Sequence, residues 1–242
     1  MHANDFELKL IIKYTLEDRM AINKNKHGNF FFNNADKSNK NFMYSNLTRG
    51  NCYNCDFSNS HFEFASLRGA HFKKCNFYRA NLKGAEFIGS NLKGSKFKEA
   101  KFEDTVFEGA NLNGTDFANA KFKNTIFVGC DLSSVKFLDT ANKNIRIFES
   151  MPELNISDEL MKVAESAMEN EFIKKSRVLD TKDGSLNGLS FMILCEKFDE
   201  ATLIEGLHYI KLEIDKDFHT LSYIIRLIEH MYDAPEESDS EE

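Results

Sequence analysis

Residues 80–99 read ANLKG AEFIG SNLKG SKFKE, four units of five residues that each carry Leu or Phe at the third position. The same spacing continues in both directions along the chain. From Phe42 to Phe137 every fifth residue is Phe or Leu, and only Cys52 interrupts the series. The residue two positions before each of them, from Ser45 to Val135, is small: Ala, Ser, Thr, Cys, Gly or, once, Val.

A period of five matches neither the 3.6-residue period of an α-helix nor the two-residue period of a flat strand. It does fit a solenoid in which five residues form one side of a square coil. The large central residue and the small residue two before it then point inward. The other three positions point outward, which explains why Asn, Lys, Glu and Gly fill them.

Units such as Ala80–Gly84 and Ala110–Gly114 resemble the A(D/N)LXX unit of pentapeptide-repeat proteins. The resemblance implies a mainly β solenoid, a right-handed quadrilateral β-helix with four faces. At about twenty residues per coil, residues 40–140 would form about five coils at the ~4.8 Å spacing of neighbouring strands.

In such a coil, residues twenty positions apart lie above one another. The map predicts a continuous buried core column of phenylalanines: Phe57, Phe77, Phe97, Phe117 and Phe137. Each apolar layer is stabilised by stacking on its neighbours, so a single coil is not expected to fold alone.

The flanks suggest a division into an N-terminal cap (1–39), the repeat region (40–140), a small α-helical domain (141–234) and a disordered acidic tail (235–242). In the cap, alternation from Phe6 to Leu16 favours a strand, although Phe6, Leu10 and Tyr14 also fit one face of a helix. After residue 140 the pattern predicts three or four helices. The first would begin at the N-cap Ser157 and run to about Leu179, and the others would start near 186, 200 and 218.

Charge is divided unevenly along the chain. Residues 40–140 carry 14 Lys or Arg and 10 Asp or Glu, whereas residues 141–242 carry 11 and 23. The start of the chain has no signal-peptide pattern, and no apolar run is long enough to span a membrane. Five cysteines without regular spacing favour a reducing compartment, so we expect a soluble, cytoplasmic protein.

Residues typical of catalysis do not form an interpretable pattern. Cys52 and Cys55 have the spacing of half a zinc or redox site, but the repeat places both in the interior, with Cys55 above Cys75. The chain contains no glycine-rich phosphate loop, HExxH or GxSxG motif. We therefore expect no enzyme activity and no catalytic, metal or cofactor-binding residue.

Two surface patterns are candidate interaction sites. One is an apolar strip at outward positions of a single face: Ile88, Val106, Ile126 and Val128. We expect the chain's own C-terminal helices to cover it, the alternatives being a homodimer contact or a foreign partner. The other is a basic patch on two adjacent faces: Lys73, Lys74, Arg79, Lys93, Lys96 and Lys98. It is either a solvated surface or a site for the acidic C-terminal region or another anionic partner.

These features favour a non-enzymatic protein–protein interaction scaffold, in which a rigid rod holds an acidic helical domain. The partner would be a protein, without direct nucleic-acid binding. The family's quinolone-resistance proteins resemble DNA in shape and negative charge and bind type II topoisomerase, which is the alternative function. This repeat region, with its excess of basic residues, departs from that pattern. A solenoid with an appended module and a glutamate-rich tail also resembles bacterial effectors, which would act inside a host cell.

Overall fold

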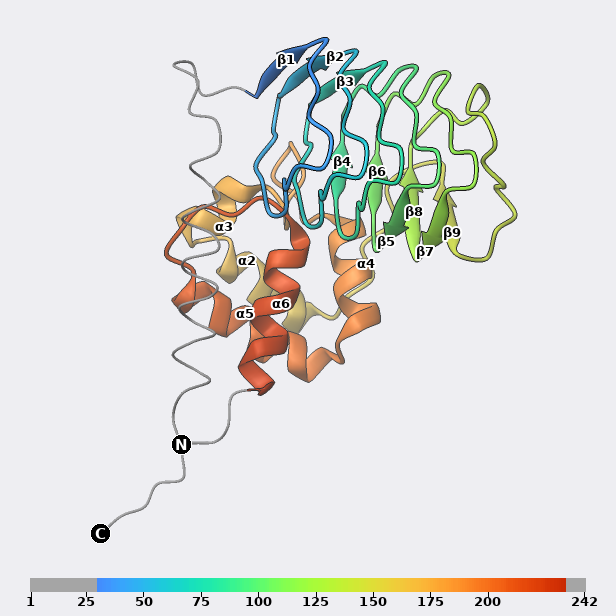
Figure 1. The fold of residues 1–242 in the computed structure, drawn as a ribbon. Helices are drawn as coiled ribbons and strands as arrows, with labels where there is room; N and C mark the ends of the chain where they lie inside the picture. The colour runs from blue at the N-terminus through green and yellow to red at the C-terminus, as the bar shows by residue number, and fades with distance from the viewer. Residues whose placement is uncertain (1–29, 234–242) are drawn as a thin grey trace. The chain divides into compact units, whose positions relative to one another are not determined.

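The computed structural model describes residues 30–233 and divides them into two compact units, which meet in the sequence at Ser150 and Met151 (Figure 1). The first unit is a β-solenoid and the second is helical. The proposed strand or helix at residues 6–16 and the acidic tail at 235–242 lie outside the described residues.

The solenoid makes about six turns over residues 31–148, so it is longer at both ends than the 40–140 expected. At its start, β1 (Phe31–Asn33) pairs in parallel with β2 (Asn51–Tyr53), and Phe32 aligns with Cys52. At its end, β9 (Ile145–Phe148) pairs with β8 (Thr125–Val128). Both terminal coils lack the repeat motif on some of their sides, and this is why the sequence pattern missed them.

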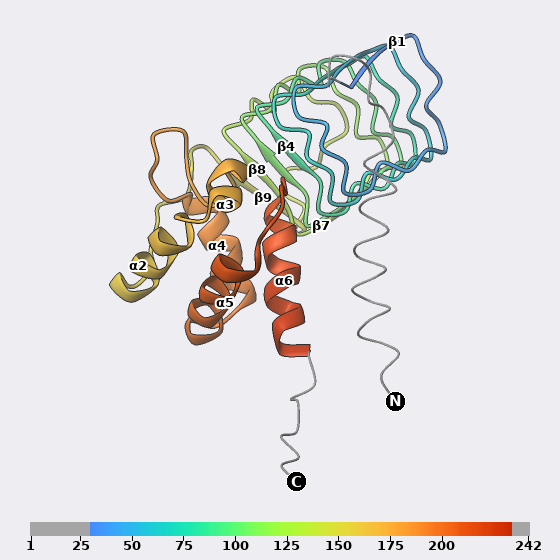
Figure 2. The same cartoon turned by 90° about the vertical axis from the view of Figure 1, so that its left-hand side faces the viewer.

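Three parallel sheets form along the solenoid, and Figure 2 shows the coils one behind another. The first is β1-β2-β3, the second β4-β6-β8-β9 and the third β5-β7. The remaining strands are β3 (His71–Lys73), β4 (Glu86–Ile88), β5 (Lys101–Glu103), β6 (Val106–Glu108) and β7 (Lys121–Lys123).

The residue before each central position influences whether a side becomes a strand or a turn. Where it is Asn or Asp, its side chain usually accepts from the amide two residues on, as Asn111 does from Asn113 at 3.1 Å and Asp116 from Ala118 at 2.9 Å. This local bond turns the chain after a single bridging residue. Where Glu86, Val106 or Ile126 occupies the position, the backbone stays extended as β4, β6 or β8.

The interior follows the twenty-residue map closely. Rings of Phe57, Phe77, Phe97 and Phe117 stack with successive centroid distances of 5.3, 4.8 and 5.2 Å. Small inward residues fill the remaining space. The buried hydroxyls of Ser95, Thr105 and Thr125 find backbone acceptors, whereas that of Ser90 has no partner in the described part of the chain. Thr105 donates to the carbonyl of Leu82 at 2.8 Å, so burial of this hydroxyl leaves no unmet hydrogen bond.

Phe137 does not join this column, contrary to the sequence prediction. Its side chain is 73% exposed, and its φ is +58°. In a regular unit the left-handed residue comes two after the centre, as at Asn119 (φ +57°) after Phe117. The departure is local, because Lys136 still pairs with Asp116 and Ile145 with Thr125 at the twenty-residue offset, and Leu138 packs against the core instead. Because no further coil stacks on this layer, little holds the Phe137 ring in the column.

The helical unit contains five helices within the described residues, against the three or four expected. They are α2 (Asp158–Ala167), α3 (Glu171–Ser176), α4 (Gly188–Lys197), α5 (Glu200–Glu213) and α6 (Leu221–Asp233). Ser157 caps α2 as predicted. The single helix expected to reach Leu179 is broken at Asn170, whose side chain accepts from the amides of Phe172 and Ile173 and starts α3.

A separate apolar core holds these helices together. Leu160 of α2, Phe191 of α4, Leu207 of α5 and Ile224 of α6 are all buried in it. Close packing of α5 on α6 depends on Gly206, because a Cβ there would lie 2.8 Å from two atoms of Ile228. Each unit therefore has its own core.

Candidate interaction surfaces

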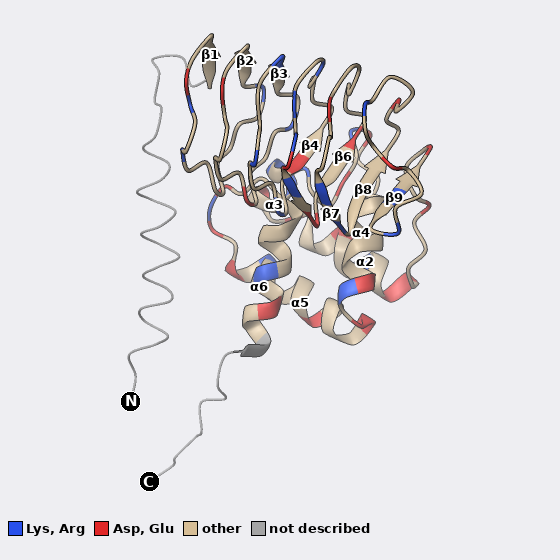
Figure 3. Cartoon of the chain, turned by 45° about the vertical axis from the view of Figure 1, so that its right-hand side comes forward, with Lys and Arg blue, Asp and Glu red and all other residues tan. Residues whose placement is uncertain are grey.

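The apolar strip lies on the outer face of the β4-β6-β8-β9 sheet, whose strands Figure 3 shows side by side. On each strand the central Phe points inward. Phe87, Phe107 and Phe127 are fully buried and stack with centroid distances of 4.7 Å. Because side chains alternate along a strand, their neighbours at positions 88, 106, 126 and 128 point outward.

Strand register shows that the four strip residues form two columns and not one. Val106 aligns with Ile126 in the first column. In the second, Glu108 lies between Ile88 and Val128. Phe148 of β9 aligns with Val128 and extends the apolar surface by one residue. Sequence reasoning missed Phe148 because β9 lies beyond the last recognisable repeat.

The basic patch contains carboxylates that sequence reasoning did not pair with it. Arg79 Nε lies 2.8 Å from Glu99 Oε2, and this contact lowers the pKa of Glu99 and raises that of Arg79. The column containing Lys96 continues to Asp116. The positive charge of the patch is therefore partly neutralised.

Lys74 of the basic patch contacts an aromatic ring and not a carboxylate. Its Nζ lies 5.4 Å from the centre of the Tyr53 ring. Its pKa is raised chiefly by hydrogen bonding to Tyr53. An ammonium held over an aromatic face is stabilised there by the ring quadrupole. Tyr53 therefore belongs to this surface, which the sequence pattern defined by its basic residues alone.

A second basic surface, which we call the lysine ladder, lies on the outer face of β5 and β7. Lys101 aligns with Lys121 in the sheet register. Beside them, Glu103 Oε1 lies 3.1 Å from Lys83 Nζ and 2.9 Å from Lys123 Nζ. The hydrogen bond from Lys123, followed by that from Lys83, lowers the pKa of Glu103. These contacts could have been predicted from the sequence, because each of them joins residues twenty positions apart.

The cysteines of the repeat are interior residues. Cys52, Cys55 and Cys75 are buried, and burial raises the pKa of Cys75 to about 12 and also raises that of Cys52. A thiol with a raised pKa is protonated at neutral pH and is a poor nucleophile. Over residues 30–233, no three His, Cys, Asp or Glu side chains are arranged to hold a metal ion.

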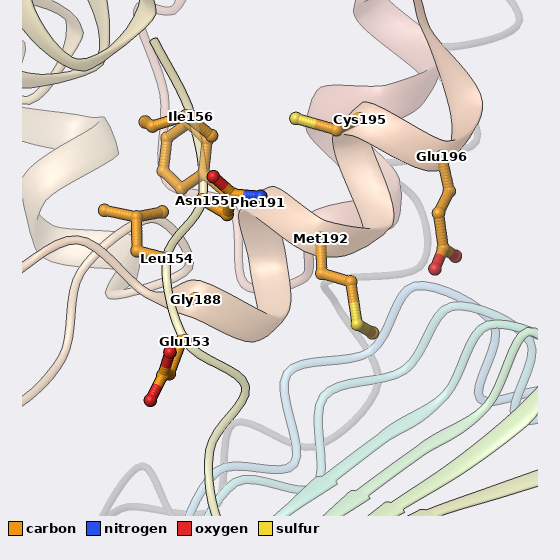
Figure 4. A pocket seen from close by; sticks show the side chains of 9 residues that line it. All are labelled: Glu153, Leu154, Asn155, Ile156, Gly188, Phe191, Met192, Cys195 and Glu196. Carbon is orange, nitrogen blue, oxygen red and sulfur yellow. The ribbon is translucent and has the colours of Figure 1, made fainter. Parts of the chain in front are cut away.

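The helical unit has a cleft of about 260 Å³ between the segment 153–156 and helix α4 (Figure 4). Gly188 allows the backbone at Pro152 to approach helix α4 closely, because a Cβ at Gly188 would lie 2.1 Å from the carbonyl oxygen of Pro152. Phe191 faces the segment, and Cys195 lies further along the helix. Partial burial raises the pKa of the Cys195 thiol. The cleft is mainly apolar and offers no paired acid and base.

Parallel coils stacked at a twenty-residue offset define a β-solenoid repeat protein. The family model for pentapeptide repeats (8 copies) matches residues 60–99, and that for the pentapeptide repeat region matches residues 80–151. Residues 60–151 of this chain are therefore similar to the pentapeptide-repeat family, as the repeat unit suggested. None of its described helices has the length and apolar character needed to cross a membrane.

Several solved structures are similar to this chain. HetL, a pentapeptide repeat protein involved in heterocyst differentiation regulation from the cyanobacterium Nostoc sp. strain PCC 7120, is 17% identical, with a TM-score of 0.41 over 60% of this chain and 57% of HetL. A pentapeptide repeat protein from the Arabidopsis thaliana thylakoid lumen is 27% identical, with a TM-score of 0.30 over 43% of this chain and 70% of that protein.

QnrB1, a plasmid-mediated fluoroquinolone resistance protein, is 16% identical, with a TM-score of 0.27 over 49% of this chain and 78% of that structure. Among curated proteins, none matches the sequence.

Proposed function

We propose that this chain is a non-enzymatic protein–protein interaction scaffold, in which a solenoid and an acidic helical unit offer two chemically different surfaces. The observation that carries the proposal is a contrast in charge: the solenoid presents the lysine ladder, whereas the helical unit is acidic. Residues 151–242 carry 9 Lys or Arg and 22 Asp or Glu. Surfaces of opposite charge select different partners and suppress wrong ones.

The solenoid suits such a role because its outward side chains are held at a fixed spacing. Contacts between coils, such as those from Asn54 to Asn34 at 2.8 Å and from Asn124 to Asp104 at 2.8 Å, order its surface before any partner binds. A surface that is already ordered loses little conformational entropy on binding.

The proposal can be tested with two charge-reversal variants of the full chain. One is Lys101→Glu with Lys121→Glu on the solenoid, and the other is Glu165→Lys with Glu213→Lys on the helical unit; all four residues are exposed. Quantitative affinity enrichment should show different proteins lost by the two variants, with unchanged circular dichroism. If both variants retain the same proteins as the wild type, the scaffold proposal is wrong.

The site of action is proposed to be the bacterial cytoplasm, or a host cell if the chain is a secreted effector. The glutamate-rich end of the chain, Pro235 to Glu242, supports the effector alternative. Fusion of a translocation reporter to the N-terminus should give a host-cell signal that is lost when residues 235–242 are removed. A signal that does not depend on these residues would contradict their proposed role.

Topoisomerase binding by DNA mimicry is the alternative function, and the charge of the solenoid argues against it. A DNA mimic must present regularly spaced negative charge, but this solenoid carries the aligned lysines Lys101 and Lys121. We therefore expect micromolar protein to leave gyrase supercoiling unchanged at physiological salt. Strong inhibition would show that the charge argument is wrong and would favour mimicry.

A further inference from the structure

One face of the solenoid carries no carboxylate over five successive coils. We call it the carboxylate-free face, and it is formed by the outward side chains of the units 30–34, 50–54, 70–74, 90–94 and 110–114. Strands β1, β2 and β3 form its first part (Figure 1), and bridges from His71 to Asn91 and from Asn91 to Asn111 continue it. The other three faces carry carboxylates in the same coils: Glu63 and Glu103, Glu86 and Glu108, and Asp56 and Glu99.

The charge of this face is positive and is not neutralised by the described part of the chain. Lys73 and Lys74 lie on one coil and Lys93 on the next. None of the three forms an ion pair with another residue of 30–233. The other half of the basic patch differs, because Arg79 is paired there with Glu99 at 2.8 Å. An ammonium group without a carboxylate beside it keeps its attraction for an incoming anion.

Exposed aromatic rings lie on the same face as these lysines. Phe31 is 57% exposed and Tyr53 is 40% exposed. Tyr53 aligns with Lys73 in the sheet register, and Lys74 Nζ lies 5.4 Å from the centre of its ring. Aromatic side chains are enriched where proteins bind one another. The combination of open rings and unpaired cations suits a partner that presents apolar and anionic side chains together.

We propose that the carboxylate-free face binds a short acidic segment of a partner protein. The carboxylates of the segment contact the lysines, and its apolar side chains cover Phe31 and Tyr53. The inference rests on the scaffold function proposed above, of which it specifies one surface and the chemistry of the partner. Five coils at ~4.8 Å each give a face ~24 Å long, which about seven extended residues span.

A protein segment suits this face better than a nucleic acid does. Bases stack on open aromatic faces, but the ammonium of Lys74 lies over one face of the Tyr53 ring. The chain as a whole carries a net charge of -7, which repels a polyanion longer than the face. A short segment avoids most of this repulsion, because charges further away than about 8 Å are largely screened at physiological ionic strength.

The test is fluorescence anisotropy of the full chain, with a labelled heptapeptide of alternating Glu and Leu as the probe. Lys73→Glu with Lys93→Glu should weaken binding of the heptapeptide at least about tenfold, because the new carboxylates repel it. Phe31→Thr with Tyr53→Thr should weaken binding at least about fivefold, because apolar contacts are lost while the strand propensity is kept.

The matched control is Lys101→Glu with Lys121→Glu on the lysine ladder. It makes the same change in charge two sides further along the coil, so it should alter the affinity less than about twofold. The substituted side chains of all three variants point away from the solenoid core. Circular dichroism should therefore be unchanged in each of them.

Four outcomes would overturn the proposal. Absence of binding, or equal losses in the Lys73/Lys93 variant and the control, would show that this face has no particular affinity for acidic segments. Unchanged binding in the Phe31/Tyr53 variant would show that charge alone acts. Tighter binding of an oligothymidylate of the same length would indicate a nucleic-acid surface. Binding that appears only after removal of residues 235–242 would show that the chain's own acidic end occupies the face.

The scaffold proposal is judged separately, by the affinity enrichment described above. If the heptapeptide binds as expected but the enriched proteins do not differ, the scaffold proposal fails and this inference stands. If the enriched proteins differ but the heptapeptide does not bind, this inference fails and the scaffold proposal stands.

Discussion

At the scale of single residues, side chains at the same repeat position contribute differently to the free energy of unfolding, as Phe97 and Phe137 show. Phe97 is fully buried between the rings of Phe77 and Phe117. Phe97→Ala should lower the free energy of unfolding by ~3–5 kcal/mol, because it leaves a cavity between two coils. Phe137→Ala is the matched control and should cost less than about 0.5 kcal/mol, since that ring is exposed. Urea denaturation measures both, and equal losses would mean that Phe137 is buried in solution.

Two glycines at equivalent places in nearly identical units also differ. Gly84 (φ +62°) ends the unit Ala80–Gly84, and Gly114 (φ +69°) ends Ala110–Gly114. A Cβ at Gly84 would lie 2.5 Å from Cδ1 of Phe64, whereas no atom lies within 4 Å of one at Gly114. The Phe64 ring also stacks on Tyr44 at 5.2 Å, which limits how far it can move.

Both Gly→Ala variants strain a left-handed residue, at about 1 kcal/mol or somewhat more. Gly84→Ala should cost a further ~1–3 kcal/mol through the Phe64 clash. Thermal denaturation of the two variants compares them directly. Equal melting temperatures would show that Phe64 moves aside without loss.

At the scale of helices, Asn170 joins two elements that are distant in sequence. Its side-chain oxygen caps α3, and its amide nitrogen donates to the carbonyls of Lys211 and Ile214 at the end of α5, at 3.0 and 2.8 Å. Asn170→Ala removes the cap and leaves both carbonyls without this donor, so it should cost ~2–4 kcal/mol.

Asn187→Ala is the control for this prediction, because Asn187 caps only α4 through the amide of Ser190. It should cost ~1 kcal/mol. Guanidinium denaturation followed by helical circular dichroism separates the two variants. If Asn170→Ala costs no more than Asn187→Ala, the bonds to α5 contribute nothing.

At the scale of the whole molecule, the apolar strip raises the question of what covers it. Val106, Ile126 and Val128 are at most 9% exposed. We expect the chain's own helices to cover them, because a row of β-branched side chains left in solvent would favour aggregation. Burial would contribute ~1.5–3 kcal/mol for each side chain that is fully covered. Val106→Lys with Ile126→Lys should leave the β circular dichroism intact, while residues 151–233 become sensitive to protease or a dimer dissociates in sedimentation.

Asn113→Lys with Ser133→Lys is the matched control for the strip. These two residues are also twenty positions apart, and both are exposed. The control should change neither protease sensitivity nor association. If the strip variant behaves like the control, the strip is an ordinary exposed surface and does not join the two units.

Much of the solenoid could be predicted from the sequence because each inward residue is surrounded by residues five and twenty positions away. The pattern around Phe97 therefore describes its own environment: stacked rings above and below, and small residues beside them. The same periodicity places Ile88, Val106, Ile126 and Val128 on one face. Register also separates Ile88 from Val128 by Glu108, which a count in steps of twenty could have shown.

The ends of the solenoid and the break at Asn170 required the tertiary structure. Phe137 carries the same motif as Phe117, but only Phe117 has coils on both sides to hold its ring in the column. β9 forms without a recognisable repeat because β8 offers it an edge to pair with. Asn170 ends a helical pattern by contacts with residues 41 and 44 positions away. The sequence determines structure where the stabilising neighbours recur at a fixed offset, and tertiary contacts decide it where that recurrence stops.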